Sequence, residues 1–208
     1  MATRSVAMWN VTWWSWLWRG PGLLSRRAAT VSTAGAALIA LLGSSYIQTA
    51  FAADSLEYAV KAAFIYKFAP YVEWPASSFS SPTSPFSICV VGDDAVSPLI
   101  DQAVTGQQVN SHPITVKHLQ AAKDSDCKIV YVASADRQTV ASNLDALRNA
   151  PVLTITDADR TPDAVGIIGF TIRNNHVRFD IDDATAASAG LVISSKLLGL
   201  ANSVKARH

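Results

Sequence analysis

Two acidic stretches have residue types that could hold a metal ion or a phosphoryl group. Gly92-Asp93-Asp94 follows an apolar run typical of a strand, a position where carboxylates can bind Mg²⁺. Asp157-Ala158-Asp159, with Asp163, loosely suggests calcium, but it lacks the central glycine and terminal glutamate of an EF-hand loop. Because aspartate is common in turns, we expect turns rather than sites at both stretches.

The histidines and cysteines form no recognisable catalytic or zinc-binding motif. The four histidines are scattered, without the i, i+4 spacing or cysteine partners of zinc sites. There is no Gly-x-Ser-x-Gly motif and no glycine-rich phosphate loop. Pairing of Cys89 with Cys127, the two cysteines of the chain, would remove its thiol nucleophiles. We predict a protein that is not an enzyme and has no metal or cofactor.

Residues 1–52 have the features of an export leader. Arg26-Arg27 precede an uncharged run from Ala28 to Ala53, and Ala50-Phe51-Ala52 has the small-x-small pattern that signal peptidase cleaves. We predict Sec export to the periplasm with cleavage after Ala52. The twin-arginine route fits less well, since Ala28-Ala29 follow the arginine pair. An uncleaved anchor is the alternative, although the Ala, Gly, Ser and Thr content makes it a weak one.

The leader is also longer than the usual ~15 to 30 residues, which suggests a translation start further downstream. It contains every tryptophan of the chain except Trp74. An interfacial aromatic anchor is the alternative explanation for that cluster.

Residues 53–208 are expected to form one mildly acidic domain. The chain has 17 Lys and Arg against 16 Asp and Glu, but its leader holds arginines and no acid, so the body has the acidic excess. Without a Lys and Arg stripe, a nucleic-acid surface is not expected. In an oxidising compartment Cys89 and Cys127 would pair, and two buried free thiols are the alternative.

Short strands alternate with helices along the body. An amphipathic helix is predicted over 56–71, strands over 86–91, 113–118, 127–132 and 151–156, and helices over 95–104 and 136–149. This alternation predicts an α/β three-layer sandwich with a mostly parallel sheet and helices on both faces. In the first helix we expect Lys61 and Lys67 to lie away from the apolar side formed by Leu56, Val60, Ala63, Phe64, Phe68 and Tyr71.

Residues 166–183 predict an antiparallel C-terminal hairpin at the edge of the sheet. Asn174-Asn175 tolerate the positive φ of a two-residue turn between two apolar runs. Asp182 or Asp183 should cap a short helix that stops at Gly190. A second helix, capped by Ser194 or Ser195, is expected to present Leu197, Leu198, Leu200, Ala201 and Val204 on its apolar side.

Four segments, Val60–Pro75, Ile88–Asp93, Cys127–Val132 and Gly166–Ala201, resemble the YfiR family in their order and spacing. The resemblance implies a periplasmic repressor that binds an inner-membrane diguanylate cyclase through its periplasmic sensor part, lowering cyclic-di-GMP and biofilm formation. It also implies a homodimeric, redox-sensitive regulator without catalytic activity.

Residue by residue, Cys89 and Cys127 match the family's disulfide between the first strand and the later central one. A second family disulfide has no counterpart here, which argues against strong redox regulation. Trp74-Pro75 matches a motif that contributes to a ligand or dimer pocket, and packing explains a tryptophan there equally well. Basic and imidazole groups near the last helix are replaced by Val192 and Ser194.

Two functions follow from these observations. As a repressor, the protein would contact its cyclase through Phe170, Arg178, Asp180 and Asp182 on and beside the hairpin. A solvated face without a partner is the alternative for these charges. As a periplasmic small-ligand-binding protein feeding a sensor or transporter, it would hold its ligand between Trp74 and the loops at the strand ends.

Overall fold

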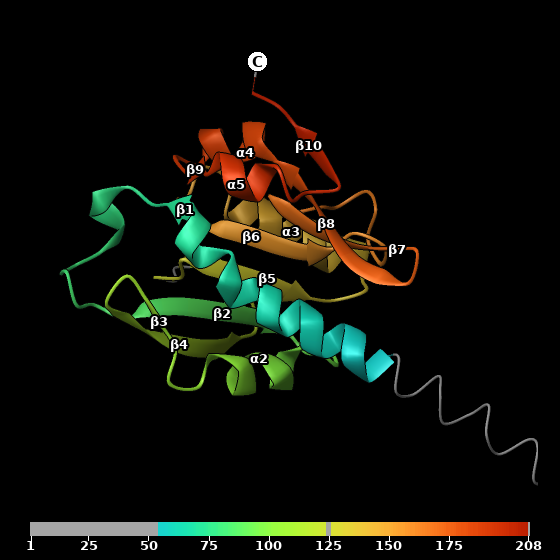
Figure 1. Ribbon diagram of the computed structural model, residues 1–208, viewed down its shortest axis with the longest axis horizontal. Coiled ribbons are helices and arrows are strands. Elements are labelled where there is room, and N and C mark those ends of the chain that lie inside the picture. The colour runs from blue at the N-terminus through green and yellow to red at the C-terminus, as the bar shows by residue number, and fades with distance from the viewer. Residues whose placement is uncertain (1–53, 124–125, 208) are drawn as a thin grey trace, which may run out of the picture. The chain divides into compact units, whose positions relative to one another are not determined.

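The computed structural model describes residues 54–123 and 126–207 of the chain. The predicted leader and its cleavage site lie outside these residues. The described part forms an α/β sandwich around an eight-stranded, mostly parallel sheet of order β10-β8-β7-β6-β5-β2-β4-β3, accompanied by a small antiparallel pair, β1-β9 (Figure 1). The predicted fold class is confirmed.

Apart from the last helix, the predicted strands and helices occur with small shifts of their ends. The first helix occupies residues 54–67 of the described part and continues into a 3₁₀ turn, Ala69–Tyr71; a second such turn covers Ala76–Ser78. The sheet strands are β2 (Phe86–Gly92), β3 (Gln108–Val109), β4 (His112–Leu119), β5 (Ile129–Ala133), β6 (Leu153–Asp157), β7 (Ile168–Arg173), β8 (His176–Asp182) and β10 (Ser203–Lys205). The remaining elements are β1 (Val72–Glu73), β9 (Val192–Ile193), α2 (Ser97–Val104), α3 (Arg137–Ala146), α4 (Asp183–Ser188) and α5 (Ser195–Leu198).

Each face of the sheet has its own buried cluster. Phe86, Ile88 and Val90 of β2 point to the face covered by the first helix, and residues of α2, α4 and α5 belong to the same cluster. Cys89 and Val91 point to the opposite face, covered by α3. This alternation is the period of two expected of a strand buried on both sides. We call the two sides the first-helix face and the α3 face.

The C-terminal hairpin forms as predicted, but it is not the edge of the sheet. Asn174 and Asn175 both have positive φ, 51° and 60°, and β7 pairs antiparallel with β8. Asp182 caps α4 by accepting a hydrogen bond from the Thr185 amide, and Gly190 follows with φ of 75°. The predicted second helix is wrong in length, because α5 ends at Leu198 and the chain then forms β10 parallel to β8.

The orientation predicted for the first helix is right for Phe68, which is buried, and for Lys67, which is exposed, but wrong at three other positions. Leu56 and Tyr71 are 66% and 40% exposed, whereas Lys61 is only 2% exposed. Two carboxylate partners, the buried Asp157 and the partly exposed Glu57, explain the position of Lys61. The residues that pack most deeply from this segment are Ala62, Ile65, Phe68 and Ala69.

Across the described ranges, no helix combines the length and hydropathy needed to cross a bilayer.

Candidate functional site

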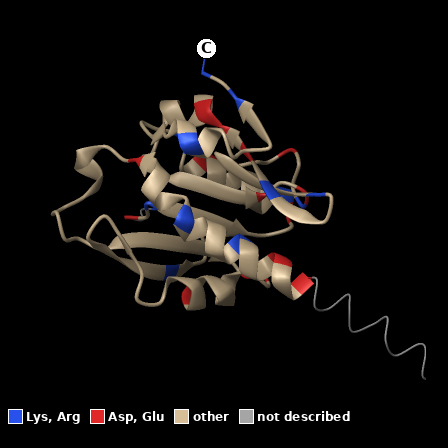
Figure 2. Cartoon of the chain, in the orientation of Figure 1, with Lys and Arg blue, Asp and Glu red and all other residues tan. Residues whose placement is uncertain are grey.

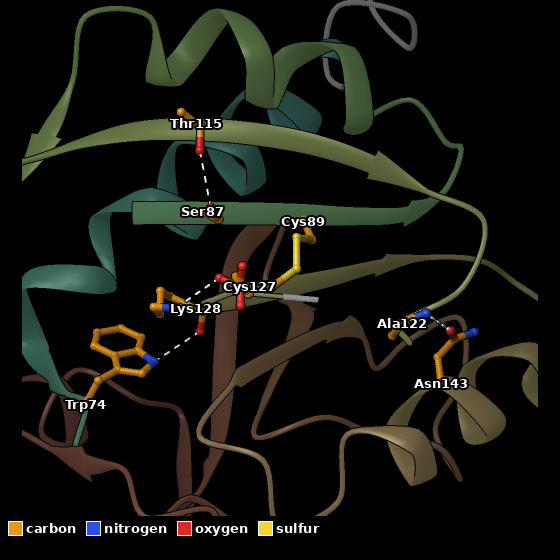
Figure 3. The surroundings of a disulfide bond; sticks show 9 residues. Trp74, Ser87, Cys89, Thr115, Ala122, Cys127, Lys128 and Asn143 are labelled. Carbon is orange, nitrogen blue, oxygen red and sulfur yellow. Dashed lines mark hydrogen bonds between the residues drawn. A yellow bond between two sulfur atoms is a disulfide. The ribbon is translucent and has the colours of Figure 1, made fainter. Parts of the chain in front are cut away.

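The structure contains the predicted Cys89–Cys127 disulfide (Figure 3). Cys89 lies in the middle of β2 and Cys127 just before the neighbouring strand β5, with 5.8 Å between their Cα atoms. Both residues are buried, at 0% and 2% exposure, on the α3 face. The bond therefore closes the loop that contains α2, β3 and β4 onto the centre of the sheet, at a position screened from solvent.

The residue after the disulfide, Lys128, connects it to Trp74. The indole N–H of Trp74 donates to the Lys128 carbonyl over 3.2 Å, and its ring packs edge-on against Phe86 at 5.1 Å between centroids. The Lys128 ammonium donates to the Asp126 carbonyl and lies 5.4 Å from the Phe79 ring centroid. Burial lowers the pKa of Lys128. Trp74 thus has a packing role and a satisfied donor, and whether it also lines a ligand or dimer pocket stays a prediction.

The residues predicted to contact a partner do not lie on one face of the hairpin. Phe170 is fully buried among the rings of Phe64 and Phe68, so it belongs to the core and its predicted contact with a partner is corrected here. Arg178 lies on the opposite side of the hairpin from Phe179 and is exposed. No acceptor within the described residues pairs with its guanidinium.

The acidic members of that group are held by the C-terminal tail. Asp180 accepts from the Asn202 side chain, Asp182 from Lys205 Nζ, both over 2.8 Å. Arg207 forms a two-pronged ion pair with Asp183, at 2.8 and 3.0 Å. Residues 202–207, which contain the strand β10 that the sequence did not predict, therefore pair with the carboxylates of Asp180, Asp182 and Asp183. Of the predicted contact residues, Arg178 is the exposed one without such a pair.

A further polar cluster, which the sequence analysis did not assemble, lies at the carboxyl ends of β2 and β6. Lys61 Nζ contacts Asp157 Oδ2 and Glu57 Oε1, each at 2.7 Å. Burial by itself lowers the pKa of Lys61, but hydrogen bonds to these two carboxylates outweigh it and raise the pKa above its ordinary value.

Beside it, Asp94 joins β2 to β5 and to the turn after β6. Asp94 Oδ2 accepts from the Tyr131 hydroxyl at 2.7 Å and from Arg160 at 3.2 Å, while Oδ1 accepts from the Val96 and Ser97 amides. Burial and the Asp94 carboxylate raise the pKa of Tyr131 far above its usual range, so Tyr131 stays a donor. The stretch after β6 forms a turn as predicted, whereas Gly92 ends β2 and Asp93-Asp94 lie in the loop that leads to α2. Topology brings the two acidic stretches together, because β2 and β6 are parallel members of one sheet and end at the same edge.

Charges of both signs are spread over the elements, and the view in Figure 2 shows no continuous Lys and Arg stripe on the described residues. In these same ranges, no group of three or more His, Cys, Asp or Glu side chains could hold a metal ion.

Fold and site together define a disulfide-bonded α/β-sandwich domain. The chain belongs to the YfiR/HmsC-like family, whose model matches residues 58–202. The matched range contains the disulfide, Trp74 and the hairpin and ends just before β10. No curated protein was found to match the chain.

Proposed function

We propose that this protein is a periplasmic regulator that binds and inhibits an inner-membrane diguanylate cyclase carrying a periplasmic sensor domain. By doing so it lowers cyclic-di-GMP and biofilm formation, without catalysing a reaction itself. The observation that carries the proposal is membership of the YfiR/HmsC-like family over most of the chain. We further propose that it acts as a homodimer.

The disulfide supports the proposed compartment. Disulfides persist in oxidising compartments such as the periplasm and are rare in the cytosol. Cys89 and Cys127 form such a bond in the buried interior on the α3 face of the sheet. We also propose that the chain reaches the periplasm by Sec export, with cleavage after Ala52.

For the contact with the cyclase we propose the exposed side of β8, centred on Arg178. An exposed guanidinium without an internal acceptor can form a bidentate pair with a carboxylate of a partner. Asp180 and Asp182 are engaged by Asn202 and Lys205, so they would hold the tail beside Arg178 rather than bind the partner directly.

Deletion of the gene in a strain that expresses the partner cyclase tests the proposal. Cellular cyclic-di-GMP should rise several-fold, and the full chain should restore the original level. A version without residues 2–52, which stays in the cytosol, is the matched control and should not restore it. Unchanged cyclic-di-GMP in the deletion strain, with the cyclase shown to be active, would count against the function; restoration by the cytosolic version would count against the compartment.

A further inference from the structure

A hollow of about 490 Å³ lies beside two neighbouring strands, β2 and β5, whose following helices cover opposite faces of the sheet. From β2 the chain passes to α2 on the first-helix face, while from the adjacent strand β5 it passes to α3 on the other face. In open α/β sheets, ligands bind outside the carboxyl ends of the strands at such a switch point. Asp93 and Asp94 follow the end of β2, and Asp157 ends β6, so the hollow lies at this edge.

The hollow carries an excess of negative charge. Its lining has five carboxylates against two basic groups, Lys61 and Arg160. Lys61 is already held by two of those carboxylates and Arg160 by a third. A fourth, Asp159, pairs with Arg173 from outside the lining. Tyr58 and Ile172 add apolar surface. The acidic members are Glu57, Asp93, Asp94, Asp157 and Asp159.

Two of the carboxylates have unused acceptor capacity. Asp157 is 7% exposed, and its Oδ1 has no hydrogen-bond partner although the side chain lines the hollow. Buried polar atoms are nearly always hydrogen-bonded, so an orphaned carboxylate oxygen calls for a donor. Asp93 is exposed at the rim, and no group of the described residues pairs with its carboxylate.

We propose that this hollow binds a small organic cation, an aliphatic amine with one or more ammonium groups. The ammonium would donate to Asp93 at the rim and, once a small rotation of the Asp157 carboxyl group turns its enclosed Oδ1 toward the hollow, to that oxygen as well. The alkyl part would lie against Tyr58 and Ile172. A volume of this size suits a compact molecule. A metal ion fits less well, because the described residues place no three ligand groups together around one point. The proposal goes beyond the regulatory function and does not depend on it.

Titration of the purified protein with putrescine, followed by calorimetry and thermal shift, tests the site. We expect saturable binding and a rise in melting temperature, since a ligand that binds only the folded state stabilises it. 1,4-Butanediol, which has the same carbon chain without charge, should not bind. Asp93→Asn should weaken binding about two- to fivefold, and Asp157→Asn about tenfold or more.

Asp101→Asn is the matched control, because Asp101 is an exposed aspartate on α2 outside the hollow. It should leave the affinity unchanged. Asp157→Asn also disturbs the Lys61 pair, whereas Asp93→Asn removes no contact within the described residues and should fold normally. Absence of saturable binding overturns the proposal. So does equal weakening by Asp93→Asn and Asp101→Asn, or Mg²⁺ that displaces putrescine at an equal or lower concentration.

Discussion

Lys61 Nζ and Asp157 Oδ2 lie 2.7 Å apart, although 96 positions separate the two residues in the chain. Their side chains are 2% and 8% exposed, so the ion pair is buried between the first helix and the end of β6. Glu57, one helical turn before Lys61, adds a second carboxylate. This arrangement fixes which side of the first helix faces the sheet.

Replacement of Lys61 by methionine should therefore destabilise the protein by about 3–5 kcal/mol, because it leaves the Asp157 carboxylate buried and uncompensated. Urea unfolding would measure the loss. The double variant Lys61→Met/Asp157→Leu should recover much of it, since two apolar side chains can replace a buried pair at little cost. A loss below about 1 kcal/mol for Lys61→Met alone would show that the pair does not hold the helix.

The pair also shows where sequence reasoning stops. Asn174-Asn175 and the Asp182 cap are local signals, and both were predicted because a turn or a cap depends on neighbouring residues. The burial of Lys61 depends on a carboxylate supplied by a distant strand, whereas helical spacing alone placed the lysine away from the apolar side of the helix.

Contacts between residues distant in the chain also decide the features that were not predicted at β10 and at the candidate site. Val204 continues the helical spacing of Leu197 and Leu200. Residues 203–205 nevertheless form a strand, because they pair with the edge of β8 that the hairpin leaves unpaired. Phe170 was predicted on a contact surface because the sequence did not reveal the aromatic rings that cover it. Two acidic turns were predicted separately, and only the order of the strands brings them into one hollow.

Removal of the disulfide in the variant Cys89→Ala/Cys127→Ala should cost about 4 kcal/mol on the chain-entropy model for a loop of this length. The bond spans 38 positions and constrains the unfolded chain around α2, β3 and β4. Urea unfolding of both proteins under non-reducing conditions would measure the difference.

Burial adds a second expectation for the same bond. Since both sulfur-bearing residues are at most 2% exposed, a mild thiol reductant should not open the disulfide in the native protein. It should be reduced readily once urea unfolds the chain. Rapid reduction of the folded protein, followed by thiol labelling at Cys89 and Cys127, would instead indicate a redox switch.

Asp182 links the stability of the C-terminal tail to pH. Burial alone raises its pKa, but hydrogen bonds from Lys205 and Thr185 outweigh this and lower it below the ordinary value of 3.8. A carboxyl whose pKa is lower in the folded state stabilises the fold above its unfolded pKa. That stabilisation disappears as the pH falls through the folded-state value.

Asp182→Asn keeps a good helix cap but removes the charge that pairs with Lys205. At neutral pH it should cost about 0.5–1 kcal/mol, a small value because Lys205 is 66% exposed. Thermal unfolding between pH 7 and pH 3 should show the two proteins converging in the acid range. Asp145→Asn is the control, because it removes the charge of an exposed aspartate on α3 that pairs, among the described residues, only with the exposed Arg148; at neutral pH it should cost less than about 0.5 kcal/mol. A difference that stays constant down to pH 3 would exclude Asp182 as its source.

Charge reversal at Arg178 is the sharpest test of the proposed partner surface. The Arg178 side chain is exposed on β8 and has no acceptor among the described residues, so Arg178→Glu should change the free energy of unfolding by less than about 0.5 kcal/mol. If the cyclase binds here, the variant should fail to lower cyclic-di-GMP in the deletion strain. Arg137→Glu is the matched control, because Arg137 is an exposed arginine on α3 with one weak pair, at 3.6 Å to Asp163. It should repress normally. Full repression by Arg178→Glu at equal periplasmic abundance would move the contact surface away from the hairpin, whereas loss of repression by both variants would mean that overall charge, rather than this position, controls binding.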